Sequence, residues 1–139
     1  MIERVLVAVD GSEMGERALR HALAAHPDAT VTVLTVVGEP SAMFGQATAI
    51  ALADDVEEST EKYARPVFER AREVAAERGA EIQTAVDVGH PARVILDRAG
   101  AFDALVIGSH GGSLADRLIV GNTAETVVRR SPVPVTVVR

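Results

Sequence analysis

The sequence predicts a doubly wound α/β domain built on a five-stranded parallel sheet with helices on both faces. Three observations support this. Short β-branched apolar runs alternate with longer helical segments, glycine or proline separates most of them, and the runs have the continuous apolar character of strands buried on both faces. Crossovers in such a domain are right-handed. A strand order of 3-2-1-4-5 would reverse between strands one and four, and ligands bind at such a reversal.

The first strand and first helix are expected at residues 4–9 and 13–25. The run RVLVAV is apolar and β-branched, and Ser12 is a good N-cap for the helix that follows. Glu13 and Glu16 lie in the first helical turn, where they complement the helix dipole and would repel a phosphate. No G-x-G-x-x-G pattern follows this strand, so the start of this helix is a poor phosphate site.

The second strand is expected at Thr30 to Val37, followed by a loop over residues 41–50. A long helix is predicted from about Leu52 to Arg78. Pro66 falls within it and is expected to kink or divide it, and Gly79 supplies its stop.

The second half of the chain continues the alternation of strands and helices. Proline at the first helical position and proline after the last helix mark two of the boundaries. The expected elements are strands at residues 82–88, 104–107 and 133–138 and helices at residues 92–99 and 122–130. With neither an internal repeat nor a linker, residues 1–139 are expected to form one domain.

The composition excludes several classes of protein. Hydrophobic residues make up 47% of the chain and charged residues 24%, as in globular domains. The net charge of -6 argues against a general nucleic-acid binder, and no apolar run is long enough to span a membrane. Cysteine is absent, which excludes disulfides and thiolate metal sites. We therefore expect a cytoplasmic protein that binds neither nucleic acid nor membrane.

A glycine-rich segment after the fourth strand is the main candidate site. Gly108, Gly111 and Gly121 lack Cβ, so a ligand can approach their main-chain N–H groups closely. A helix that begins at Asn122 or Thr123 would direct its unpaired N–H groups toward the same place. A strand, a glycine loop and a helix N-terminus together favour binding of an anion, most often phosphate.

The spacing of these glycines resembles that of the universal stress protein family. Its ATP-binding branch carries Gly, two residues, Gly, nine residues, Gly and then Ser or Thr. Here Gly108, Gly111 and Gly121 reproduce that spacing. The likeness extends over the whole chain, from the opening VAVDGS through GHPA to the closing PVPVTVV. The resemblance implies a Rossmann-like nucleotide-binding domain.

The resemblance also implies which residues contact the nucleotide. Val9 and Asp10 would line the adenine and ribose end, and Val36 or Val37 would add an apolar wall. The three glycines would surround the ribose and phosphates through their backbones. The predicted ATP-binding residues are therefore Val9, Asp10, Val36, Val37, Gly108, Ser109, His110, Gly111, Gly121, Asn122 and Thr123.

Asn122 departs from the family pattern, which has Ser or Thr at this position. Its amide can donate to a phosphate oxygen and cap a helix, but it is a poor substitute for a hydroxyl beside magnesium. Thr123 offers a hydroxyl one residue later. ATP with Mg²⁺ is the expected cofactor, with no metal ligand assigned. For His110, a phosphate contact or loop role is favoured over catalysis, because no partner carboxylate or nucleophile stands at a fixed spacing.

The expected function is that of an ATP-binding regulatory module of the stress response, with at most slow hydrolysis and an unknown client protein. A dimeric interaction protein that binds no nucleotide is the alternative. A nucleotidyl-transfer enzyme is a third hypothesis, weakened because no HIGH-like turn follows strand one.

The last expected strand, Val133 to Val138, predicts a homodimer. Pro134 has no N–H for a ladder, which restricts the strand to an edge or to a position free of hydrogen bonds. Its valines are too apolar to leave uncovered. Pairing with the same strand of a second copy would cover it, as the resemblance also implies.

Overall fold

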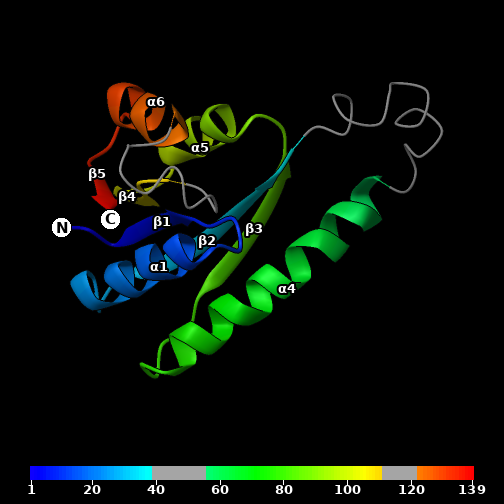
Figure 1. The fold of residues 1–139 in the computed structure, drawn as a ribbon. Coiled ribbons are helices and arrows are strands. Elements are labelled where there is room, and N and C mark those ends of the chain that lie inside the picture. The colour runs from blue at the N-terminus through cyan, green and yellow to red at the C-terminus, as the bar shows by residue number, and fades with distance from the viewer. Residues whose placement is uncertain (39–55, 111–121) are drawn as a thin grey trace.

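The computed structural model describes residues 1–38, 56–110 and 122–139 as a sheet between two layers of helices (Figure 1). The order of elements matches the predicted alternation. The elements are β1 (Arg4–Ala8), α1 (Glu13–Ala25), β2 (Thr30–Val37), α4 (Val56–Ala76), β3 (Gln83–Val88), α5 (Pro91–Ala99), β4 (Ala104–Gly108), α6 (Asn122–Arg130) and β5 (Val135–Val138).

The sheet has the predicted strand order, β3-β2-β1-β4-β5, and every pairing in it is parallel. Strand β1 lies at the centre, with Val7 opposite Val33 of β2 on one side and Val106 of β4 on the other. The order therefore reverses at β1 and β4, and the crevice beyond their carboxyl ends is where an open α/β sheet takes its ligand.

Two apolar cores lie on opposite faces of the sheet, which explains the continuous apolar character of its central strands. Helices α1 and α4 cover one face, and α5 and α6 cover the other (Figure 1). Alternate residues of β1 point into different cores: Val5 and Val7 pack toward α1 and α4, and Leu6 packs toward α5 and α6.

Helix α1 begins where the sequence predicts. The side chain of Ser12 accepts a hydrogen bond from the N–H of Gly15 at 3.3 Å, which satisfies one of the unpaired donors of the first turn. Gly11 adopts φ 84°, a left-handed conformation that glycine takes without strain. The turn from β1 into α1 is therefore fixed by local chemistry.

Helix α4 corrects the expectation for Pro66. The helix runs from Val56 to Ala76 with Pro66 inside it, so this proline does not divide it. Val67, Ala71 and Val74 pack in the core that α4 shares with α1, and this burial supports a continuous helix. The helix ends at Ala76, two residues earlier than expected, where Gly79 at φ 66° reverses the chain.

Strand β5 also begins two residues later than expected, at Val135. The hydroxyl of Ser131 accepts from the N–H of Val133 at 3.1 Å and donates to its carbonyl oxygen at 2.7 Å. These bonds occupy Val133 in a local turn, so the strand begins after it.

The expected loop at residues 41–50, the expected helix start at Leu52 and the connection 113–120 lie outside the described residues. None of the helices in the described part of the chain combines the length and apolarity needed to cross a bilayer.

Candidate functional site

A hollow of about 310 Å³ opens at the carboxyl edge of the sheet, between the ends of β1 and β4. We call it the crevice. It lies at the reversal of strand order, where sequence reasoning places the ligand. Seven of the predicted site residues line it: Val9, Asp10, Val36, Gly108, His110, Asn122 and Thr123.

Two predicted residues do not line the crevice. Val37 pairs with Val88 of β3, and its carbonyl accepts from the N–H of Gly89 at 2.9 Å. Of the two valines offered as an apolar wall, Val36 is therefore the one at the crevice. Ser109 is buried, and its N–H bonds to the carbonyl of Val138 at 2.8 Å. Gly111 and Gly121 lie outside the described residues.

Asp10 is held in place by the turn that begins α1. Its Oδ1 accepts hydrogen bonds from both the N–H of Ser12, at 3.0 Å, and the hydroxyl of Ser12. Ser12 in turn caps α1. Asp10 is itself exposed, so one carboxylate oxygen orders the turn while the side chain lies at the crevice wall. This geometry allows Asp10 both to order the turn and to contact a ligand in the crevice.

Val9 follows the last residue of β1 and is held by two hydrogen bonds to β2. Its N–H donates to the carbonyl of Leu34 at 2.9 Å, and its carbonyl accepts from the buried hydroxyl of Thr35 at 2.6 Å. Thr35 thus positions the end of β1 where it meets the crevice. Sequence reasoning missed this residue, although a threonine among the valines of β2 is a signal that a buried hydroxyl needs a partner.

The N-termini of two helices face the crevice. Pro91 is the first residue of α5, and Asn122 and Thr123 open α6. Each helix directs the positive end of its dipole toward this edge. The acidic first turn of α1 is further neutralised, because Glu16 pairs with Arg20 and Arg70. Electrostatically the crevice favours an anion at the α6 side.

Helix α5 contributes an apolar wall that sequence reasoning did not assign. Pro91 and Ile95 line the crevice together with Leu34 and Val36 of β2. The predicted parallel sheet could have indicated this wall. Strand β3 ends at the same edge as β1 and β4, and α5 begins at Pro91 shortly after it. A flat apolar group, such as a nucleobase, fits this side better than a charged one.

His110 follows β4 and lines the crevice. Its Nδ1 is 3.0 Å from the hydroxyl oxygen of Ser109, so the neighbouring serine orients the ring. Within the described ranges no carboxylate is bonded to this imidazole. The arrangement resembles a hydrogen-bonding loop more than the base of a catalytic triad.

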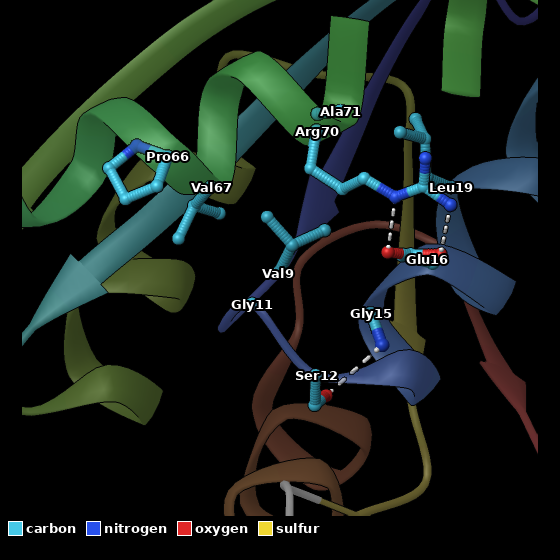
Figure 2. Close-up of a pocket in the computed structure, with 10 residues that line it drawn as sticks. All are labelled: Val9, Gly11, Ser12, Gly15, Glu16, Leu19, Pro66, Val67, Arg70 and Ala71. Atoms are coloured by element: carbon cyan, nitrogen blue, oxygen red, sulfur yellow. Dashed lines mark hydrogen bonds and ion pairs between the residues drawn. The ribbon is translucent and has the colours of Figure 1, made fainter. Parts of the chain in front are cut away.

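A second hollow, of about 160 Å³, lies on the other face of the sheet between α1 and α4 (Figure 2). Val9, Leu19 and Val67 line it, and Nε and Nη2 of Arg70 donate to the carboxylate of Glu16 at 2.8 and 3.2 Å. The hydrogen bond from Arg70 is the main cause that lowers the pKa of Glu16. Because its charged groups are paired with each other, this hollow offers little to an anionic ligand.

The whole chain, residues 1–139, matches the model of the universal stress protein family. It belongs to that family. The universal stress protein YxiE of Bacillus subtilis is 32% identical over 148 residues, covering 100% of both chains. The fold is shared with universal stress protein UspA from Lactobacillus plantarum, with a TM-score of 0.82 and 28% identity over 99% of this chain and 98% of that one.

Another solved universal stress protein was crystallised in complex with cAMP. This protein superposes on it with a TM-score of 0.70 and 25% identity, covering 99% of this chain and 97% of the other. The family assignment and the parallel fold thus agree with the resemblance of the glycine pattern.

Proposed function

We propose that this universal stress protein binds ATP in the crevice and acts as a regulatory module of the stress response, with at most slow hydrolysis. The observation that carries the proposal is the meeting of Asp10, Gly108 and the start of α6 at one hollow at the reversal of strand order. The relative that was crystallised with cAMP supports an adenine nucleotide as the ligand class.

The nucleotide would lie across the crevice from α5 to α6. The adenine would contact the apolar wall of Val36 and Ile95, and Asp10 would accept hydrogen bonds from the ribose or adenine. The phosphates would lie at Gly108 and Asn122, where the dipole of α6 favours negative charge. Gly111 and Gly121 are proposed to complete the phosphate cradle, as the glycine spacing predicts.

Magnesium fits this site as an ion carried by the phosphates. Mg²⁺ in nucleotide sites takes one or two protein oxygens, with phosphate and water completing its coordination. Asp10 and Thr123 offer such oxygens at the crevice. Across the described ranges, no group of three His, Cys, Asp or Glu side chains is placed to hold a metal. When bound, the ion would neutralise phosphate charge.

Slow turnover follows from what surrounds the phosphates. Asp10 is hydrogen-bonded to Ser12, and Nδ1 of His110 lies 3.0 Å from the hydroxyl oxygen of Ser109. Neither arrangement prepares a strong general base for an attacking water. We therefore propose binding, and the conformational consequences of binding, as the function.

Mass spectrometry of ligand released from natively purified protein tests the proposal. ATP, or ADP from slow hydrolysis, should be recovered at a substantial fraction of the protein concentration. Protein that is stripped, incubated with ATP and repurified should regain it. Failure of the stripped protein to retain ATP would favour the alternative, an interaction protein of the same fold that binds no nucleotide.

A further inference from the structure

A third hollow, of about 230 Å³, lies beside helix α1 and shares one lining residue with the crevice. His110 lines both hollows. Its other walls are Glu13, Met14 and Arg17 of α1 and Arg139, which follows β5. His110 therefore stands between the crevice and a space that two arginine side chains line.

The two arginines are available to a ligand. Arg17 and Arg139 are both exposed, and Nη1 of Arg17 makes only a long hydrogen bond, 3.4 Å, to the main-chain oxygen of Arg139. Within the described residues neither forms an ion pair. By contrast Arg20, one turn further along α1, pairs with Glu16 and Glu77. Glu13, the acid in this hollow, has an interaction of its own.

The position of Arg17 relative to the end of β4 is fixed by packing. Met14, three residues before Arg17, is buried against Gly108 so closely that a Cβ on the glycine would meet its Cγ at 2.4 Å. Residues three apart on a helix are neighbours on its surface. The contact of Met14 with Gly108 therefore holds Arg17 near the end of β4. The guanidinium is anchored on the same framework as the proposed phosphate site.

We propose that Arg17 and Arg139, together with His110, form a subsite for the distal phosphates of the bound nucleotide. This inference rests on the proposed function and adds a specificity to it. A monophosphate would end in the crevice, whereas the longer chain of a triphosphate would pass His110 and reach the guanidiniums. Guanidinium–phosphate hydrogen bonds are charge-assisted and strong. In a protein of net charge -6, such a local cationic pair would offset part of the charge that each further phosphate adds.

Calorimetric titration with ATP and AMP, each with magnesium, tests the subsite. The full-length chain is stripped of ligand and compared with Arg17→Gln, Arg17→Lys and Arg139→Gln. Arg78→Gln is the matched control, because Arg78 is exposed beyond the end of α4 and lines none of the three hollows. Circular dichroism and urea unfolding establish that each variant is folded.

The wild type should bind ATP more tightly than AMP. Arg17→Gln should weaken the affinity for ATP about tenfold, the loss expected for a hydrogen bond to a charged group. The affinity for AMP should stay unchanged. Arg17→Lys should recover part of the difference, Arg139→Gln should act in the same direction, and Arg78→Gln should change neither affinity.

Two outcomes would overturn the subsite and leave nucleotide binding intact. One is equal wild-type affinity for ATP and AMP, and the other is an equal loss of both affinities in Arg17→Gln. Absence of binding for both nucleotides to the wild type would instead defeat the proposed function and the subsite together.

Discussion

The Cβ that Gly108 lacks would lie 2.4 Å from Cγ of Met14, so strand β4 and helix α1 meet where no side chain fits. Gly108 does not have a positive φ; among the described residues only Gly11, Gly79 and Gly89 do. The first glycine of the pattern is therefore required by helix–strand packing, independently of any ligand. Its presence alone is weak evidence for phosphate binding.

Gly108→Ala should accordingly destabilise the protein even without nucleotide. Met14 must move to admit the methyl group, and overpacking of this kind costs about 1–3 kcal/mol. Urea unfolding measures the change. Gly100→Ala is the matched control: Gly100 is in the right-handed helical region with open space around its Cβ, and its replacement should be neutral or stabilising. Equal stability of Gly108→Ala and wild type would refute the packing account.

Thr35→Val should reduce both stability and nucleotide affinity. The substitution keeps the shape but removes the hydroxyl that donates to the carbonyl of Val9 at 2.6 Å. A buried carbonyl left without a partner costs about 1–3 kcal/mol. Thr35→Ser retains the donor and should recover most of the ATP affinity, as judged by calorimetry on folded protein. An unchanged affinity in Thr35→Val would show that Val9 needs no such support.

The ion pair between Glu16 and Arg70 should contribute to stability in a pH-dependent way. Arg70 lowers the folded-state pKa of Glu16 below the ordinary value of 4.5, so the contribution is fully present above that value and lost as pH falls through the folded-state pKa. The unfolding free energies of wild type and Glu16→Gln should differ at neutral pH and converge in acid. Glu69→Gln, a substitution at an exposed acid of α4, provides a control. A difference that is independent of pH would contradict the assignment.

The homodimer proposed through β5 gives a test of assembly. Strand β5 is at the edge of the sheet, and the carbonyls of Pro134 and Val138 bond to β4, so the main-chain groups of Val135 and Val137 point away from it. Light scattering should show a dimer at micromolar concentration. Val137→Pro removes one outward N–H and should shift the protein toward monomer with its helix content retained. A monomeric wild type would defeat the dimer.

Substitutions at the start of α6 probe the phosphate cradle. Asn122 lines the crevice. Asn122→Ala should weaken the binding free energy of ATP by about 1.5–3 kcal/mol, the value of one hydrogen bond to a charged group. Asn122→Ser restores the family's hydroxyl and should keep or improve binding. Gly121→Val should abolish binding, since a β-branched side chain would occupy the space that phosphates need. Wild-type affinity in Asn122→Ala would remove this residue from the site.

Much of the fold followed from sequence because local signals and burial agree. Strands buried on both faces are apolar throughout, and the Ser12 cap and the Gly79 reversal mark helix ends. A division of α4 at Pro66 was one of the two expected effects and does not occur, because the local cost of the proline is outweighed by packing of α4 on the core. That packing depends on which residues of α1 contact α4 in the shared core, and the local sequence around Pro66 does not specify this contact.

The lining of the crevice was predictable where strand ends and glycine spacing indicate it, as at Asp10, Gly108 and Asn122. It was not predictable where tertiary packing decides. Val36 and Val37 are alike in sequence, but side chains alternate along β2, and Val36 is the one that packs on the core of α5 and α6 and lines the crevice. Arg17 was hidden for the same reason, since its approach to His110 depends on the contact between Met14 and Gly108.

The most direct test of nucleotide binding is the melting temperature of ligand-stripped protein with and without ATP and magnesium. A ligand that binds only the native state raises the free energy of unfolding in proportion to the logarithm of its concentration once it exceeds the dissociation constant. The melting temperature should therefore rise steadily with ATP in wild type and stay constant in Gly121→Val. A wild-type melting temperature that does not change up to millimolar ATP would contradict nucleotide binding, and the glycines would then be explained by backbone packing alone.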